Sequence, residues 1–190
     1  FCMGGPMDTF MEDQYPWLKV EKSVVKDAVL SRNMPFLGIC LGHQLLAEVA
    51  GGQVNRMIQS EIGIKNITLT SHGQMDPMFM GLDSKINCLQ WHSCEVSILP
   101  PNSKILANSP QCEIQAFKVG SHAYGLQYHV ELTSKTVQEW GEIPIYKNSL
   151  EEALGPNGLE ILKMEAGQNM SNFKSNAYRI YRNFLNIVRK

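Results

Sequence analysis

The 190-residue sequence has no excess of either charge, no long apolar run and no paired cysteine motif. Its 17 Lys and Arg residues nearly balance its 18 Asp and Glu residues, so the formal net charge is −1. Proteins that bind nucleic acid usually carry a basic patch, and this balance argues against a nucleic-acid partner. No run of about 18 uninterrupted apolar residues occurs, so the sequence predicts no membrane-spanning helix and no membrane partner.

The five cysteines are odd in number and scattered along the chain, at positions 2, 40, 88, 94 and 112. They form no Cys-x-x-Cys pair and no Cys/His spacing typical of zinc. The sequence therefore predicts no metal site and no other cofactor. Scattered, unpaired thiols are typical of a reducing compartment, and we expect a cytoplasmic protein.

The length and the 44% hydrophobic content are enough for one substantial core, so we expect a single domain over residues 1–190. The first six residues, Phe1-Cys2-Met3-Gly4-Gly5-Pro6, look like the end of a strand that enters a loop. The two glycines would let this loop approach another part of the fold closely. We expect the first strands of the fold to lie upstream of this sequence.

The stretch from Pro35 to Gly52 contains the strongest functional signal in the chain. The apolar run over 36–39 predicts a short buried strand, and the leucines that follow Cys40 recur at helical spacing as far as Gly51. Cys40 therefore lies at a predicted strand-to-helix corner. Glycines two positions before it and two positions after it make this corner a thiol version of the Gly-x-Ser-x-Gly nucleophile elbow.

The predicted corner gives a physical reason for a reactive thiol. The turn is so tight that side chains in place of Gly38 and Gly42 would collide with neighbouring backbone. The N-terminus of the following helix offers free N–H groups and the positive end of a dipole, which favour a thiolate and an oxyanion. The alternative is a buried structural cysteine, because a free cysteine is usually buried and behaves as a small apolar residue.

The second signal is His129-Val130-Glu131, at the end of a predicted strand. On an extended strand, residues i and i+2 project from the same face about 7 Å apart. Glu131 can then orient the His129 ring while the other ring nitrogen faces a thiol, which is the nucleophile, base and orienter arrangement of a triad. The alternative is coincidence, since His-x-Glu on a strand is by itself rarely catalytic.

The other histidines and cysteines are weaker candidates. His43 is expected to be a wall residue of the site, His92 is expected to line a pocket, and His72 and His122 are expected to be solvated. The remaining thiols are interpreted as ordinary core or near-surface cysteines: Cys2, Cys88, Cys94 and Cys112.

Apolar periodicity predicts the remaining elements. Helices are expected over 16–32 and 171–190, with another beginning at 137–140. Strands are expected over 52–58, 62–70, 86–99, 104–107, 115–119 and 123–131. Residues 71–82 are expected to form a loop with a short helix, and 144–158 a polar, turn-rich connection with a weak helical signal near Leu150 to Leu154. The last helix is expected to bury Tyr178, Tyr181, Phe184, Leu185 and Val188.

Four motifs together resemble the class I (triad) glutamine amidotransferases, and within them the stand-alone proteins similar to the amidotransferase domain of GMP synthase. In chain order they are Gly4-Gly5-Pro6, Gly38-Ile39-Cys40-Leu41-Gly42-His43-Gln44, Leu89-Gln90-Trp91-His92 and Tyr124-Gly125-Leu126-Gln127-Tyr128-His129-Val130-Glu131. The resemblance covers roughly residues 1–140, which leaves about 141–190 as a C-terminal helical extension. It implies a flavodoxin-like three-layer α/β/α fold whose first strands precede the Gly-Gly-Pro loop.

The resemblance also implies a reaction, the hydrolysis of glutamine to glutamate and ammonia through a cysteinyl thioester. Cys40 would attack the side-chain carboxamide, His129 would act as acid and base, and Glu131 would orient the His129 ring. The backbone N–H groups of Gly5 and Leu41 would form the oxyanion hole. The residues implied to hold the substrate are Gln44 at the amide and Trp91, His92, Ser93 and Cys94 at the amino-acid end.

The sequence departs from the family after the tryptophan. The family commonly has His-Gly-Asp, whereas this chain has His92-Ser93-Cys94-Glu95, so the carboxylate near the substrate amino group is absent or displaced onto Glu95. This change favours a second interpretation, a γ-glutamyl peptidase with the same triad. A third interpretation is a catalytically silent regulatory protein on the same fold.

The expected ligand is glutamine or another γ-glutamyl compound. The sequence has no Ser-Gly-Gly-x-Asp-Ser pyrophosphate loop and no other nucleotide-binding run. A synthetase that uses the ammonia must therefore be a separate protein or be absent.

Overall fold

The computed structural model describes residues 1–189. The helices are α1 (Trp17–Lys26), α2 (Leu41–Val49), α3 (Ser71–Met75), α4 (Thr136–Gly141), α5 (Pro144–Leu154) and α6 (Gly158–Val188), with a π-helical turn at Asp27–Ser31 and a 3-10 turn at Pro77–Phe79. The strands are β1 (Phe36–Ile39), β2 (Gln53–Leu69), β3 (Lys85–Ile98), β4 (Ser103–Asn108), β5 (Ala116–Val119) and β6 (Ala123–Leu126).

The strands form a six-stranded mixed sheet in the order β1-β6-β5-β4-β2-β3. β1 and β6 are parallel, and the other neighbouring pairs are antiparallel. On its other side β1 pairs with Cys2, whose N–H donates to the Leu37 carbonyl and whose carbonyl accepts from the Ile39 N–H. This pairing places the Gly-Gly-Pro loop beside the end of β1, where Cys40 follows.

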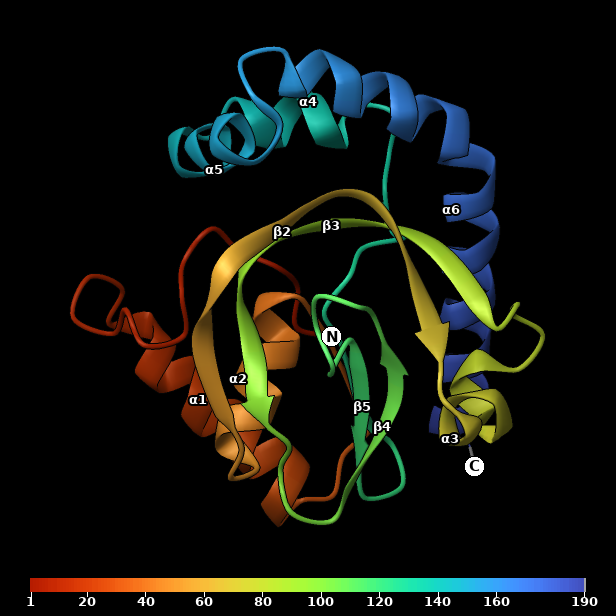
Figure 1. The fold of residues 1–190 in the computed structure, drawn as a ribbon. Coiled ribbons are helices and arrows are strands. Elements are labelled where there is room, and N and C mark those ends of the chain that lie inside the picture. The colour runs from red at the N-terminus through yellow and green to blue at the C-terminus, as the bar shows by residue number, and fades with distance from the viewer. Residues whose placement is uncertain (190) are drawn as a thin grey trace.

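Helices cover both faces of the sheet, so the fold has three layers (Figure 1). Successive side chains of β1 point to opposite faces. Phe36 packs in the cluster that contains Leu18 of α1 and Leu45 of α2, whereas Leu37 packs in the cluster that contains Phe184 of α6. The predicted α/β/α layering is confirmed.

A third buried cluster joins α4, α5 and the beginning of α6 to the strands β2 and β3. Its members include Trp91 of β3, Leu150 of α5 and Leu162 of α6. Figure 1 shows α4 and α5 above the curved β2–β3 pair, away from the sheet-covering part of α6. This cluster positions α5 near the residues that follow β1.

Several predicted elements differ from the structure. The two strands expected over 52–58 and 62–70 are the single strand β2, whose register with β3 is interrupted between Arg56 and Glu61 without ending the strand. The strand expected over 123–131 ends at Leu126. The connection expected over 144–158 contains α5, because Pro144 suits the first helical position and Gly155, with φ 78°, ends the helix.

The closing helix is longer than predicted and buries different residues. It begins at Gly158, and the expected core residues Tyr178 and Tyr181 are 63% and 49% exposed. Ile180 and Phe184 are buried instead. The reason is that one continuous helix must pack on two cores, the α4–α5 cluster and the sheet, and these together set its rotation.

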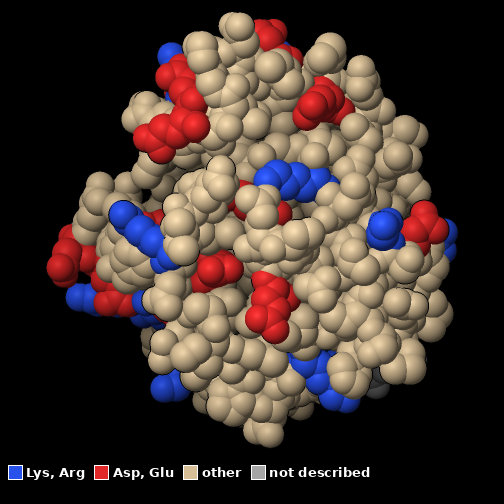
Figure 2. All heavy atoms as spheres, in the orientation of Figure 1, with Lys and Arg blue, Asp and Glu red and all other residues tan. Residues whose placement is uncertain are grey.

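On the face seen in Figure 2, neither positive nor negative side chains gather into one large patch. The Lys and Arg side chains are separated by acidic and uncharged residues. Among residues 1–189, every helix is too short or too polar to cross a membrane.

Candidate active site

Cys40 lies at the corner between β1 and α2, with φ 52° and ψ −103°. A positive φ is strained for a residue with a side chain and is typical of a nucleophile elbow. A Cβ on Gly38 would lie 2.3 Å from the Gly42 carbonyl oxygen, and a Cβ on Gly42 would lie 2.2 Å from the Cys2 carbonyl oxygen. The predicted collision of these side chains with neighbouring backbone is confirmed.

His129 follows β6 and is held by two backbone hydrogen bonds to Leu89 of β3, each of 2.9 Å. The Nδ1 atom of His129 lies 2.6 Å from Glu131 Oε1, and Glu131 Oε2 accepts a hydrogen bond of 2.9 Å from the Val130 N–H. The predicted geometry, two side chains on one face of a strand, is wrong because β6 has already ended. The predicted contact between the two side chains nevertheless forms, and the hydrogen bond from the Val130 N–H fixes the Glu131 carboxylate.

Gly4 brings the N-terminal loop against both Cys40 and His129. A Cβ on Gly4 would lie 3.2 Å from His129 Cε1, 3.3 Å from Cys40 Cβ and 3.9 Å from Cys40 Sγ. These contacts are tight for any side chain, so the loop approaches the thiol and the ring with bare backbone. The same three contacts show that Cys40 and His129 are neighbours.

The charge of the His129 ring follows from its partners. Burial alone would lower the pKa of His129, but the Glu131 charge and hydrogen bonding with Cys40 and Glu131 raise it to about 10. Burial alone would raise the pKa of Glu131, but the His129 charge and hydrogen bond lower it. At neutral pH the pair is therefore an imidazolium and a carboxylate.

Cys40 borders a cavity of about 340 Å³, a size in the range of small-molecule sites. The wall residues are Gly5, Pro6, Met7 and Asp8 of the N-terminal loop, Leu41 and Gln44 of α2, Arg56, Met57 and Ser60 at the β2 irregularity, Trp91, His92, Ser93 and Cys94 of β3, and Ile145, Tyr146, Ser149 and Glu152 of α5. All residues predicted to bind the substrate or to form the oxyanion hole are among them. His129 and Glu131 are not wall residues of this cavity.

The backbone N–H groups of Gly5 and Leu41 have no backbone acceptor within residues 1–189. Leu41 is the first residue of α2, where an N–H has no partner inside the helix. Two donors are thus free at the wall of the cavity that holds Cys40.

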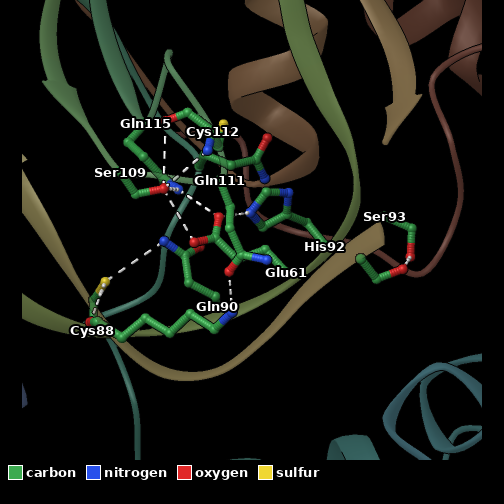
Figure 3. A network of polar contacts seen from close by, with 12 residues as sticks. Glu61, Cys88, Gln90, His92, Ser93, Ser109, Gln111, Cys112 and Gln115 are labelled. Atoms are coloured by element: carbon green, nitrogen blue, oxygen red, sulfur yellow. Dashed lines mark hydrogen bonds and ion pairs between the residues drawn. The ribbon is translucent and has the colours of Figure 1, made fainter. Parts of the chain in front are cut away.

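A buried polar network lies behind this wall (Figure 3). His92 Nε2 lies 3.1 Å from Glu61 Oε2, and His92 Nδ1 lies 2.8 Å from the Cys94 carbonyl oxygen. Both ring nitrogens of His92 are thus engaged with oxygen atoms of the protein. Gln115 and Ser109 also donate to Glu61, at 2.7 Å and 3.1 Å. Burial alone would raise the pKa of Glu61, but the His92 hydrogen bond and charge lower it.

This network holds Gln44 in place. Gln44 Nε2 donates to the Cys94 carbonyl oxygen at 3.2 Å and to Gln127 Oε1 at 3.0 Å. The same Cys94 carbonyl accepts from His92. His92, predicted to hold the substrate, thus borders the cavity but uses both ring nitrogens to fix the protein around Gln44.

Sequence reasoning missed the charged residues of the wall, Asp8, Arg56 and Glu152, because no motif spacing connects them. Arg56 Nη2 lies 2.8 Å from Asp8 Oδ2. Glu95, the proposed position of the displaced family carboxylate, lines a separate surface depression. Glu95 therefore supplies no carboxylate to the cavity beside Cys40.

Residues 2–140 match the family described as glutamine amidotransferase class-I, and the chain belongs to this family. The fold described above is thus that of a class I glutamine amidotransferase, in agreement with the resemblance of the four motifs.

Two individual proteins are similar to this chain over different parts of its length. The chain is 43% identical over 101 residues to a subunit of the glutamine-hydrolyzing GMP synthase of Pyrococcus abyssi, an alignment that covers 53% of this chain and 52% of that protein. It is 29% identical over 182 residues to the glutamine amidotransferase-like protein YfeJ of Salmonella typhimurium, covering 94% of this chain and 73% of that protein. The aligned part thus spans about half the length of the archaeal relative.

A solved structure shares the fold over almost the whole chain. The crystal structure of a glutamine amidotransferase from Thermotoga maritima superposes with a TM-score of 0.82 and 30% sequence identity, covering 97% of this chain and 78% of that chain.

Proposed function

We propose that this protein hydrolyses the γ-carboxamide of glutamine through a thioester on Cys40 and releases glutamate and ammonia. The observation that carries this proposal is the position of Cys40, at a strained elbow between the cavity and the His129–Glu131 ion pair. Membership of the glutamine amidotransferase class-I family supports the same reaction.

In the first half of the proposed reaction, the Cys40 thiolate attacks the carboxamide carbon. The N–H groups of Gly5 and Leu41 would stabilise the negative oxygen of the tetrahedral intermediate. The His129 imidazolium then donates a proton to the amide nitrogen, the C–N bond breaks, and ammonia leaves. The product of this half is a γ-glutamyl thioester on Cys40 and a neutral His129 ring.

In the second half, water attacks the thioester carbon and gives a proton to His129. The intermediate collapses, the C–S bond breaks, and Cys40 leaves as a thiolate beside the restored imidazolium. Glu131 stays ionised throughout; its contact with Nδ1 keeps the other ring nitrogen directed toward the sulfur.

The test is the removal of the nucleophile. Cys40→Ala should lower glutamate release from glutamine by about 10³-fold or more, because no other group can form the thioester. Cys112→Ala, which removes a buried thiol outside the cavity, is the matched control. Persistent glutaminase activity in Cys40→Ala would contradict the proposal, and so would failure of a glutamine-analogue electrophile to label Cys40 in folded protein. The latter result would favour a catalytically silent protein.

We further propose that the ammonia is used by a separate synthetase. The likeness to a protein named as one subunit of a glutamine-hydrolyzing GMP synthase supports this partner. A synthetase that copurifies with the protein and receives its ammonia without release to solvent is the expected result. Full glutaminase activity with all ammonia released, in the presence of that synthetase, would argue for a stand-alone hydrolase.

A γ-glutamyl peptidase is the second candidate, and the Ser93-Cys94-Glu95 segment favours it. Glu95 lies outside the cavity, so the amino-acid end of the substrate is not held as the family pattern implies. Turnover of glutamine compared with turnover of γ-glutamyl peptides separates the two candidates. Inactivity on all peptides tested would remove the peptidase.

A further inference from the structure

We propose that Glu152, on α5, binds the α-ammonium group of the γ-glutamyl substrate. This inference rests on the proposed function, because it assigns the amino-acid end of the same substrate. Glu152 lies outside residues 2–140, the part of the chain that matches the family. The contact would replace the carboxylate that the Ser93-Cys94-Glu95 segment fails to supply to the cavity.

One face of α5 forms a wall of the cavity. The α5 residues on that wall are Ile145, Tyr146, Ser149 and Glu152. Their spacing of i, i+1, i+4 and i+7 places them on one side of a helix. Leu150 is buried in the cluster that also contains Trp91, so the helix is anchored to β3 next to the cavity.

α5 lines the cavity along its length, from Tyr146 in its first turn to Glu152 in its last. Tyr146, in the first turn of α5, lines the cavity together with Cys40. The Tyr146 ring is 5.6 Å from the Trp91 ring, so this turn is fixed. Glu152 follows about 9 Å further along the helix axis, and helical side chains lean back toward the N-terminus. Glu152 therefore lines the same cavity as Cys40 from the opposite end of α5.

Two carboxylates line the cavity, Asp8 and Glu152. Within residues 1–189, the Glu152 carboxylate makes no hydrogen bond and no ion pair. The other wall carboxylate, Asp8, accepts from Arg56 through Oδ2 at 2.8 Å and from the Cys94 thiol through Oδ1 at 3.2 Å. Both oxygens of Asp8 are engaged, and its charge is balanced by Arg56. An ammonium group entering the cavity thus meets one unbalanced negative charge, that of Glu152.

The presence of a glutamate at position 152 is not explained by a contribution to the stability of α5. The neighbouring Glu151 pairs with Lys147 one turn earlier, at 3.8 Å. Glu152 has Asn148 one turn earlier and Pro156 one turn later, neither of which is a cation. It also lies in the last turn of α5, where the helix dipole disfavours a negative side chain. A position that breaks a local rule without local compensation is typical of a functional site.

The experiment compares Glu152→Gln with the control Glu151→Gln on two substrates, glutamine and glutaramate, which has the same carboxamide but no α-amino group. Glu152→Gln should raise the KM for glutamine about tenfold or more and change kcat less than about threefold, because the ammonium contact is the same in the ground state and the transition state. It should change kcat/KM for glutaramate less than about twofold, and Glu151→Gln should leave both substrates unaffected. An unchanged KM for glutamine, or equal losses on both substrates, would overturn the inference.

Equilibrium binding separates this inference from the proposed function. Calorimetry compares glutamine binding to Cys40→Ala and to Cys40→Ala combined with Glu152→Gln. A loss of about tenfold or more in the double variant supports the inference even if the wild-type protein hydrolyses no glutamine, in which case only the proposed function fails. Equal affinities, or no binding to either protein, overturn the inference. Hydrolysis with an unchanged KM overturns the inference and leaves the proposed function standing.

Discussion

His43 is close to Cys40 in the sequence, and His129 is close to it in space. Both histidines are buried, with 0% and 2% of their surface exposed. Their pKa values are shifted in opposite directions. Burial lowers the pKa of His43 to about 3, whereas the Glu131 charge overcomes burial and raises the pKa of His129 to about 10. At neutral pH, His43 is therefore an uncharged ring and His129 an imidazolium.

The difference between the two pKa values comes from the groups that surround each histidine ring. Neither ring nitrogen of His43 makes a hydrogen bond within residues 1–189, although backbone of Gly125 and Ile114 lies nearby. Its ring packs edge-on against Phe117 at 4.9 Å, on the sheet side of α2 and not on the cavity wall where it was expected. A buried histidine beside an apolar wall is held neutral, and one beside a carboxylate is held charged. Burial alone therefore does not identify a catalytic histidine in this chain.

Replacement of His129 should have the largest effect. His129→Gln should lower kcat for glutamine hydrolysis by about 10³-fold or more, because the amide cannot shuttle a proton at either step. The measurement is steady-state release of glutamate, with circular dichroism to verify folding. His43→Gln is the matched control and should lose less than about tenfold. Equal losses in the two variants would erase the functional contrast between the histidines.

Removal of the charge on Glu131 should have an intermediate effect. Glu131→Gln should lower kcat by about 10²-fold, because the ring keeps a hydrogen-bond acceptor but loses the charge that stabilises the imidazolium. The pKa of His129 then falls from about 10, so the alkaline limb of the pH profile should move to lower pH. The check is kcat/KM measured from about pH 6 to about pH 11. An alkaline limb that stays in place would show that the Glu131 charge does not set the protonation of His129.

Replacement of His43 should have the smallest effect on activity and a distinct effect on stability. The folded pKa of His43 is about 3, below its ordinary value of 6.5, so its contribution to stability is present above pH 6.5 and is lost as pH falls toward 3. Each unit of this pKa difference corresponds to about 1.4 kcal/mol. His43→Leu should therefore make the free energy of unfolding fall less steeply with acid.

The measurement for His43→Leu is urea unfolding at several pH values between about 7.5 and about 4, beside the same change at the exposed His72 as control. Identical pH slopes in wild type and His43→Leu would mean that His43 is not held neutral by the fold.

Local chemistry made several features predictable. The elbow at Cys40 needs glycine at 38 and at 42 because backbone lies within 2.3 Å of where each Cβ would stand, and that need is visible as a spacing in the sequence. The strand before Cys40 and the helix after it follow from apolar periodicity over a few residues. The His129–Glu131 contact was also anticipated, although the strand geometry offered for it was wrong.

The remaining features depend on residues that are distant in the chain. Glu61 was not recognised as the partner of His92, because the pairing arises from the register of β2 with β3. The rotation of α6 follows from two cores that the helix must satisfy together.

By itself, the sequence determined the glycine-lined corner that holds Cys40 and the contact between His129 and Glu131, because each rests on turn chemistry or on near neighbours in the chain. Only the tertiary structure decided that α5 closes the cavity and that Glu152 faces it. The physical reason is that the position of α5 is set by the burial of Leu150 against β3, a long-range contact that the local pattern of residues 144–158 does not encode.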